Sequence, residues 1–258
     1  MSIDLTGRTA LVTGAGRGIG EAIARALADA GASVVLAARS VRQVSAVASA
    51  INAQGGSALA VECDVTSEES VASLNGEIMA AFGTVDILVN NAGTGHSALL
   101  HRTTLDDWNR VMAVNATGAF LCTRAFLPGM VAQEWGRVIN IASVAGLSGQ
   151  RYIAAYTASK HAVIGLTRAA AAETAGTGVT VNALCPAFVD TPMTDETVAN
   201  VSKQTGKSSA DALAMVLATT DQARLVTPEE VARHVIALCS DDADATNGEA
   251  IVIDGKES

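Results

Sequence analysis

Tyr156 and Lys160 are the two residues of this sequence whose types and spacing most directly suggest catalysis. They lie four positions apart in the stretch YTASK, and this spacing stacks two side chains on one face of a helix, about 6 Å apart along its axis. A free tyrosine has a pKa of about 10, and a neighbouring ammonium favours the phenolate. The pair is therefore suited to pass a proton near neutral pH, although such a pair taken alone is more often an ordinary surface contact.

Ser143 and Asn115 are polar residues at positions where they are useful to the same chemistry. Ser143 ends the stretch NIAS at the end of a predicted strand, where its hydroxyl can hydrogen-bond a substrate carbonyl oxygen, although serine there is usually a turn former. Asn115 lies inside a helical pattern that asparagine does not favour, which predicts a perturbed backbone or a held water. Together the four residues specify a reaction that none of them specifies alone.

A glycine-rich stretch, TGAGRGIG, lies between the first predicted strand and the first predicted helix. Its residues Gly14, Gly18 and Gly20 allow a tight turn and a close approach of the backbone to a ligand, and the following helix presents free N–H groups to an anion. A glycine cluster alone is equally consistent with a structural turn, but this position favours a dinucleotide pyrophosphate. Arg17 and Ile19 belong to the same loop and are included in the predicted cofactor site.

Seven short apolar runs alternate with segments of helical periodicity along the chain. Because the runs are continuously apolar and separated by helices, we expect an α/β, Rossmann-type doubly wound fold, with a mainly parallel sheet and helices on both faces. No repeat or linker marks a boundary, so residues 1–258 are predicted to form a single dinucleotide-binding and catalytic domain. Residues 191–227, the least regular connection, are predicted to act as a substrate loop or lid. The expected strands are residues 8–13, 33–38, 57–64, 85–90, 137–143, 179–185 and 249–254.

The glycine spacing GxxxGxG, with motifs that follow it in order, resembles the short-chain dehydrogenase/reductase family over essentially the whole chain. The resemblance implies that Lys160 holds the nicotinamide ribose, that a proton relay runs through Asn115, and that the chain forms a homotetramer. The residues that carry it are the adenine-contacting pair Asp64 and Val65, the NNAG stretch Asn90, Asn91, Ala92 and Gly93, the catalytic set Asn115, Ser143, Tyr156 and Lys160, and Pro186, Val189 and Thr191 beside the nicotinamide.

The stretch LAARS, at the end of the second predicted strand, bears on the choice between NAD and NADP. About 20 residues after the glycine loop, dinucleotide folds often place a carboxylate that binds a ribose, but here Ala38 is followed by Arg39 and Ser40. A guanidinium binds a 2'-phosphate with two hydrogen bonds, whereas a carboxylate repels it. Arg39, backed by Ser40 and Arg17, therefore predicts NADP(H); the alternative is a solvated loop charge.

The expected reaction is hydride transfer between the nicotinamide and a carbonyl or secondary alcohol carbon, with Tyr156 as acid in reduction and base in oxidation. Many sequences with this pattern resemble 3-oxoacyl-thioester reductases. An acidic carrier protein needs basic patches for docking, and residues 132–136 and 173–178 contain no Lys or Arg, which favours a coenzyme A thioester. The alternatives are a free small ketone or secondary alcohol and, less in keeping with the catalytic set, a non-catalytic cofactor-binding scaffold. Ala187 and Lys256 stand where the family pattern has glycine.

The charge balance excludes several kinds of partner. Seventeen Lys and Arg against 26 Asp and Glu give a net charge of -9, the wrong sign for binding nucleic acid or anionic lipid. No basic signal region precedes an apolar run and no stretch approaches about 18 apolar residues, which predicts a cytoplasmic protein without a membrane span. The four cysteines are far apart and lack metal-ligand spacing, so we expect reduced, buried thiols and no metal.

Overall fold

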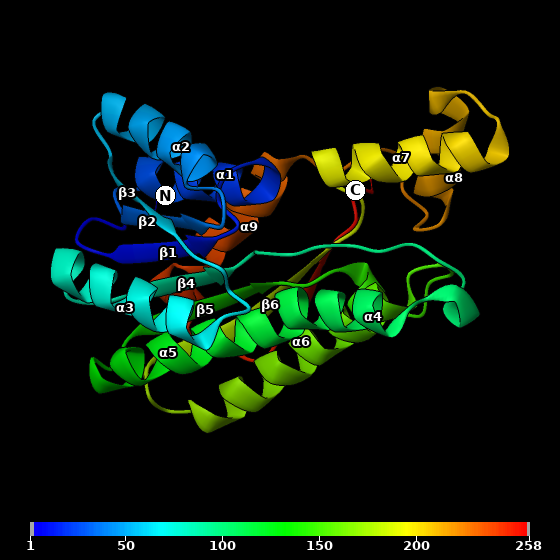
Figure 1. Cartoon of the computed structure of the whole chain (residues 1–258). Coiled ribbons are helices and arrows are strands. Elements are labelled where there is room, and N and C mark those ends of the chain that lie inside the picture. The colour runs from blue at the N-terminus through cyan, green and yellow to red at the C-terminus, as the bar shows by residue number, and fades with distance from the viewer. Residues whose placement is uncertain (1–2, 257–258) are drawn as a thin grey trace.

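The computed structural model describes residues 3–256, which contain a seven-stranded sheet of parallel strands (Figure 1). The strand order is β3-β2-β1-β4-β5-β6-β7, and every neighbouring pair is parallel. The predicted Rossmann-type doubly wound fold and its seven strands are therefore confirmed. The strands are β1 Thr9–Thr13, β2 Ser33–Ala38, β3 Ser57–Glu62, β4 Ile87–Asn90, β5 Gly136–Ile141, β6 Val179–Pro186 and β7 Ala250–Ile253.

Helices cover both faces of this sheet (Figure 1). They are α1 Gly18–Asp29, α2 Val41–Ala53, α3 Glu68–Phe82, α4 Leu105–Met112, α5 Gly118–Ala132, α6 Ala154–Glu173, α7 Pro192–Thr205, α8 Ser209–Ala218 and α9 Pro228–Leu238. Helices α1, α2 and α9 pack on one face, and α3, α5 and α6 on the other. Because both faces are covered, the central strands are buried along their whole length, which explains their continuously apolar sequences.

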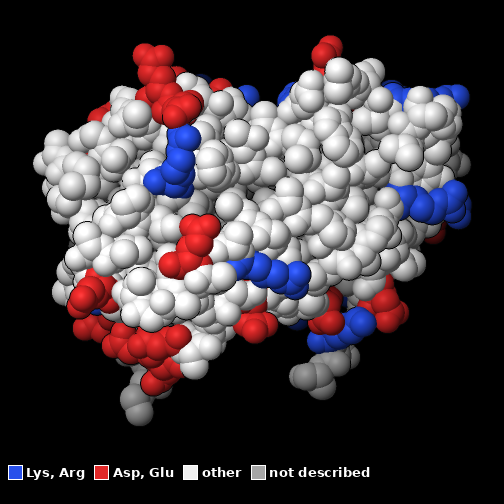
Figure 2. All heavy atoms as spheres, turned by 90° about the horizontal axis from the view of Figure 1, so that it is seen from below, with Lys and Arg blue, Asp and Glu red and all other residues white. Residues whose placement is uncertain are grey.

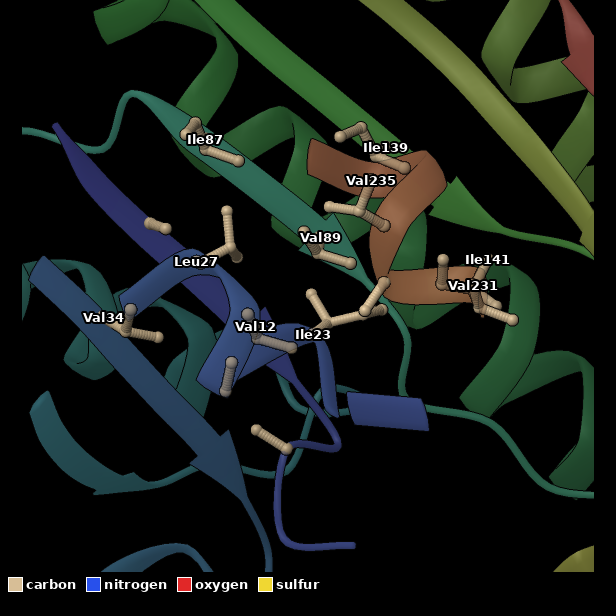
Figure 3. Close-up of a cluster of buried hydrophobic side chains, with 14 of the residues drawn as sticks. Val12, Ile23, Leu27, Val34, Ile87, Val89, Ile139, Ile141, Val231 and Val235 are labelled. Carbon is tan, nitrogen blue, oxygen red and sulfur yellow. The ribbon is translucent and has the colours of Figure 1, made fainter. Parts of the chain in front are cut away.

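The apolar core under α1 and α9 fixes the position of the glycine loop (Figure 3). Ile23 and Leu27 of α1 and Val231 and Val235 of α9 are fully buried against the sheet. Burial of one such side chain contributes about 1.5–3 kcal/mol, so the start of α1 is held firmly at the end of β1. The strand residues that meet them are Val12, Val34, Ile87, Val89, Ile139 and Ile141.

The order of the strands determines where a ligand is bound. The chain proceeds outward from β1 through β2 to β3 and then crosses back to β4 on the other side of β1. In open α/β sheets the ligand lies outside the carboxyl ends of the strands at such a reversal. The loops that follow β1 and β4 therefore meet at one edge, although they are far apart in the sequence.

The segment 191–227 is more regular than the sequence indicated. We expected the least ordered connection of the chain, but it contains α7 and α8, which project beyond the sheet (Figure 1). Pro192 occupies the first turn of α7, Gly206 follows it in the left-handed conformation, and the Ser208 side chain caps the start of α8. The expectation was wrong because these two helices are weakly amphipathic, so their periodicity is hard to recognise.

A continuous helical run, Leu105–Ala132, joins α4 to α5 through a π-helical turn at Ala113–Thr117. By length and composition this run is apolar enough to cross a membrane, whereas the sequence predicts no such stretch. Core helices of globular proteins pass the same test. Here Phe126 and Met130 of α5 are at most 4% exposed and pack against the sheet, so the run is explained as a core element.

Arg137, in β5, is a fully buried cation at the amino-terminal edge of the sheet. Its guanidinium donates hydrogen bonds to the carbonyl oxygens of Gly136 at 3.0 Å and Gly178 at 3.1 Å, and lies 4.5 Å from the centre of the Trp135 ring. It also forms an ion pair with Asp244, whereas its Nε atom has no hydrogen-bond partner. Asp244 thus supplies a negative charge that compensates a buried positive one.

We expect Asp244→Ala to lower the free energy of unfolding by about 2 kcal/mol, because the Arg137 guanidinium would stay buried without this carboxylate. The loss is smaller than for a fully buried pair, since the Asp244 side chain is 68% exposed. Urea unfolding measures the effect, with Asp241→Ala as a control on an exposed aspartate of the same turn. Identical midpoints for Asp244→Ala and the unchanged protein would show that solvent alone compensates Arg137.

Candidate active site

Helix α6 places Tyr156 and Lys160 next to each other, as their spacing predicts. Lys160 Nζ lies 5.6 Å from the centre of the Tyr156 ring and donates a hydrogen bond to the carbonyl oxygen of Ile141 at 2.7 Å. Lys160 is 5% exposed. Its ammonium group is therefore fixed by the end of β5 as well as by its own helix.

The pKa values of this pair differ from the sequence-based expectation. Burial lowers the pKa of Lys160 to about 8, and burial raises the pKa of Tyr156 above its ordinary value. Burial outweighs the influence of the Lys160 charge that the spacing predicts, because loss of solvent disfavours the charged form of both groups. A hydrogen bond with Ser143 acts in the opposite direction on the Tyr156 pKa. Tyr156 is therefore a protonated acid at neutral pH.

Ser143 lies directly after β5 and caps the short 3-10 helix Val144–Gly146. Its Oγ accepts a hydrogen bond from Ala145 N at 3.1 Å and donates a long one to Pro186 O at 3.4 Å. The Ser143 hydroxyl is near enough to Tyr156 to lower the Tyr156 pKa, so two O–H groups meet at the carboxyl edge of the sheet. Two such donors stabilise a carbonyl oxygen as it gains negative charge.

Asn115 lies in the π-helical turn between α4 and α5, in keeping with its poor helix propensity. Its Oδ1 accepts a hydrogen bond from Thr94 N at 2.8 Å, and its Nδ2 donates to Thr94 O at 3.0 Å and to Ser159 Oγ at 2.9 Å. Ser159 donates in turn to the carbonyl oxygen of Tyr156 at 2.7 Å. The Asn115 side chain thus holds the loop after β4 against α6, and a proton relay through Asn115 stays a prediction.

The glycine loop is packed so closely at Gly14 and Gly20 that neither position has room for a side chain. Gly14 and Gly18 have φ values of 66° and 57°, and a Cβ on Gly20 would lie 2.4 Å from Gly14 O. Asn91 donates its side-chain amide to Thr13 O at 2.9 Å, which ties the loop after β4 to the loop after β1. No side chain caps the start of α1. These residues fit the pyrophosphate of a dinucleotide, because the open N–H groups and the helix dipole both favour an anion there.

Arg39 and Ser40 are exposed where β2 passes into α2. Ser40 is the N-cap residue of α2, but its side chain makes no capping hydrogen bond, which leaves this helix start open to an anion. Hydrogen bonds from Thr66, and more weakly the charge of Arg39, lower the pKa of Asp64. The structure thus brings together Arg39, which is predicted to bind the 2'-phosphate, and Asp64, which is predicted to contact the adenine.

The other predicted cofactor residues lie along the same edge. Arg17 is exposed and Ile19 half-buried at the start of α1, while Val65 is 8% exposed behind Asp64. Ala92 N donates a hydrogen bond to Thr13 Oγ1 at 3.0 Å. Gly93 lies beside the catalytic group, since a Cβ on it would be 3.9 Å from Lys160 Nζ.

Pro186, Val189 and Thr191 form the opposite side of the edge, where β6 leads into α7. Thr191 Cγ2 lies 3.3 Å from the position of a Cβ on Gly18, so the start of α7 covers the glycine loop. Val189 pairs with Val226 in an isolated parallel bridge. The predicted cofactor residues thus line one continuous edge from Arg39 to Thr191.

The chain matches the family described as short chain dehydrogenase over residues 8–202. It belongs to the short-chain dehydrogenase family. Its likeness to individual members extends over nearly the whole chain. This short-chain dehydrogenase therefore catalyses the interconversion of a ketone and a secondary alcohol with NAD(P).

Three members illustrate the range of substrates in the family. The 3-oxoacyl-[acyl-carrier-protein] reductase FabG of Aquifex aeolicus (strain VF5) is 40% identical over 256 residues, which cover 99% of each chain. The D-beta-hydroxybutyrate dehydrogenase of Rhizobium meliloti (strain 1021) is 35% identical over 253 residues, 96% of this chain and 97% of that protein. The crystal structure of an actinorhodin polyketide ketoreductase variant with NADPH is 36% identical, with a TM-score of 0.92 over 97% of this chain and 98% of that one.

In this short-chain dehydrogenase we expect Gly20→Ala to weaken NADPH binding at least tenfold, because the added Cβ must displace Gly14 O, which it would meet at 2.4 Å, and Asn91 Nδ2, at 2.5 Å. Titration of NADPH fluorescence measures the dissociation constant. Gly76→Ala in α3 is the control, since its Cβ would meet nothing within 4 Å. Equal affinities for the two variants would contradict a tightly packed phosphate loop.

Two residues that position this site, Thr13 and Ser159, are not predicted by the motifs that contain them. Thr13 Oγ1 accepts hydrogen bonds from Asn91 N and Ala92 N, both at 3.0 Å, and Ser159 joins Asn115 to the Tyr156 carbonyl. Both stand inside the motifs TGAGRGIG and YTASK, but a hydroxyl in a motif does not reveal its partner. Within residues 3–256 no cluster of His, Cys, Asp or Glu is arranged to hold a metal ion, and all four cysteines are buried free thiols.

Proposed function

We propose that this enzyme uses NADP(H) to interconvert 3-oxoacyl thioesters, of the coenzyme A type, with their 3-hydroxyacyl forms. The observation that carries the cofactor choice is Arg39, exposed at the end of β2 with Ala38 in place of a carboxylate. The open start of α2 adds N–H groups beside it. A 2'-phosphate satisfies both features, whereas a 2'-hydroxyl satisfies neither.

The proposed mechanism divides the work among the catalytic residues. A bound nicotinamide supplies or accepts the hydride. The Ser143 hydroxyl donates a hydrogen bond to the substrate oxygen, and Tyr156 donates its proton to that oxygen in reduction or accepts one in oxidation. Lys160 binds the nicotinamide ribose, and its charge favours the phenolate that forms on Tyr156 when the proton has left. Asn115 binds Thr94 and Ser159 and so holds the loop after β4 against α6.

Apolar side chains around the carboxyl edge support an acyl substrate. Leu99, Leu147, Met193 and Met215 are 40–45% exposed, and they lie in the loops after β4 and β5 and in α7 and α8. Exposed apolar side chains in the loops and helices at the ligand-binding edge suit the binding of an apolar group. An acyl chain would bury these side chains when it binds, and we propose that the 191–227 segment closes over it as a lid.

The choice of a coenzyme A thioester over a carrier protein rests on charge. Arg124 on α5, a possible docking cation, already pairs with Glu68 and lies 5.2 Å from the Phe120 ring centre. Residues 132–136 and 173–178 contain no Lys or Arg. Arg168 on α6 is the other exposed cation that could serve an acidic carrier protein. With so few basic residues on this surface, we propose coenzyme A as the carrier. The alternative substrate is a free small ketone or secondary alcohol, which the same catalytic residues would serve equally well.

The face formed by α5 and α6 supports the proposal of a homotetramer. Figure 2 shows a wide area on this side without Lys, Arg, Asp or Glu. Phe120 and Val131 of α5 are 43% and 36% exposed, respectively. Surfaces of this kind commonly pack against a second copy. We also propose that the enzyme is located in the cytoplasm.

The proposed function is tested by measuring initial rates with NADPH and with NADH. Each cofactor is tested on acetoacetyl-coenzyme A and on a free ketone of similar acyl size. We expect NADPH and the thioester to give the highest kcat/KM. Activity with the free ketone alone would overturn the thioester assignment. A preference for NADH would overturn the assignment of Arg39.

A further inference from the structure

Gln222 is a buried amide outside the catalytic set, in the turn that leads from α8 back to the sheet. It is 8% exposed. Its Oε1 accepts a hydrogen bond from Phe188 N at 2.8 Å, and its Nε2 donates one to Phe188 O at 3.0 Å. One side chain therefore satisfies both backbone polar groups of a residue 34 positions away.

The remaining capacity of the Gln222 amide is used within its own turn. Nε2 also donates to Arg224 O at 3.1 Å, and Oε1 also accepts from Thr220 Oγ1 at 2.6 Å. An apolar side chain of the same length would leave the N–H of the half-buried Phe188 without this partner, which is costly. The arrangement therefore depends on an amide and not only on the volume of Gln222.

These bonds extend a short parallel pairing between residues 188–190 and Val226. We call this pairing, together with the turn 222–225, the neck of the 191–227 segment. Val226 N donates to Phe188 O and Asp190 N donates to Val226 O, both at 2.9 Å, around the bridge between Val189 and Val226. The Gln222 side chain adds two hydrogen bonds to this pairing, at Phe188 N and Phe188 O. The two ends of the segment are thus joined to each other as well as to the sheet.

The neck lies between the cofactor site and the proposed substrate site. On one side Thr191 covers Gly18 of the glycine loop. On the other, Ala187 lines a cavity of about 150 Å³ together with Val144, Gln150 and Thr220. A shift of the Phe188 backbone would therefore move a wall of that cavity and the base of α7 together.

The C-terminal tail packs on the same neck. A Cβ on Gly255 would lie 3.2 Å from Arg224 O and 3.7 Å from Gln222 Nε2, and Lys256 Nζ lies 3.4 Å from Asp221 Oδ2. Ala187 N donates to Ile253 O at 2.9 Å. Ala187 is not among the residues with positive φ, so the alanine that replaces the family's glycine is accommodated without strain.

We propose that Gln222 is a positioning residue for the reaction, which fixes the Phe188 backbone and so sets how far the 191–227 lid opens over the substrate. This inference rests on the proposed function for the identity of the substrate. In this proposal Gln222 contacts neither the substrate nor the cofactor. Its effect passes through Phe188, and it is therefore expected in substrate binding rather than in proton or hydride transfer.

Gln222→Met tests this role, since it keeps the length of the side chain and removes the amide. We expect the KM for the ketone substrate to rise about tenfold while kcat changes less than threefold, because loss of these hydrogen bonds loosens the neck but leaves the catalytic groups in place. Native-state trypsin digestion gives a second readout. Cleavage at Lys203 and Lys207, which are exposed at the end of α7 and in the turn before α8, should accelerate about tenfold.

Gln54→Met is the matched control, because Gln54 is exposed at the end of α2. Gln222→Glu is a second variant, which keeps the acceptor for Phe188 N but turns a buried carboxylate oxygen toward Phe188 O and Arg224 O, so its effects should be at least as large as those of Gln222→Met. Unchanged KM and unchanged cleavage at Lys203 and Lys207 in Gln222→Met would overturn the proposal. Equal acceleration at Arg42 in α2 would also overturn it, since that would indicate global unfolding. If the unchanged enzyme reduces no ketone, the proposed function fails, whereas the digestion still decides whether Gln222 holds the lid.

Discussion

Tyr156→Phe is expected to reduce kcat for ketone reduction about 1000-fold, within the range that a general acid contributes. The phenyl ring keeps the packing on α6 but has no proton to donate to the substrate oxygen. Because burial keeps Tyr156 protonated at neutral pH, the loss should be as large at pH 6 as at pH 8. Stopped-flow and steady-state NADPH oxidation measure the rate.

The fold and the cofactor site should survive this substitution. The dissociation constant for NADPH should change less than threefold. Tyr152→Phe is the matched control, since Tyr152 is exposed in the turn before α6 and its hydroxyl accepts a hydrogen bond, among residues 3–256, only from Arg151 Nη2, at 3.4 Å. Turnover of Tyr156→Phe close to that of Tyr152→Phe would refute Tyr156 as the acid.

Arg39→Asp is expected to lower the ratio of kcat/KM for NADPH to that for NADH at least 100-fold. The substitution removes charge-assisted hydrogen bonds worth about 1.5–3 kcal/mol and places a carboxylate beside the 2'-phosphate, which repels it. The same carboxylate accepts hydrogen bonds from the ribose hydroxyls of NADH. The loss should therefore fall on NADPH alone.

Arg233→Asp controls for the change in net charge. Arg233 lies on α9, and its side chain is 71% exposed. It should leave the NADPH to NADH ratio within about twofold, because exposed charges at a distance are screened by salt. A ratio that is unchanged in Arg39→Asp as well would mean that Arg39 is only a solvated surface charge.

The relatives of this chain show why its substrate is harder to assign than its reaction. A protein 40% identical to it bears the name of an acyl-carrier-protein reductase, and another, 35% identical, bears the name of a hydroxybutyrate dehydrogenase. The catalytic residues stand on α6 and at the end of β5, which pack into the core. The apolar residues that would meet the substrate stand in loops and in α7 and α8, and these are not fixed by the same core.

Local patterns in the sequence determined the elements that position the site. The seven apolar runs predict the seven strands, because a sheet covered on both faces requires continuously apolar strands. Helix α9 begins at Pro228, directly after Thr227, whose side chain forms a capping box with Glu230. The spacing of Tyr156 and Lys160 predicts their shared face on α6, since helical geometry alone sets it.

Only the tertiary structure decided how these groups behave and which other residues hold them. Burial lowers the pKa of Lys160 and raises that of Tyr156, and burial depends on elements that fold over them from distant parts of the chain. The Asn115 side chain binds Thr94 and Ser159, and the Gln222 amide binds Phe188. No spacing predicts such pairings, because a hydrogen bond between distant residues depends on where the whole fold places two atoms.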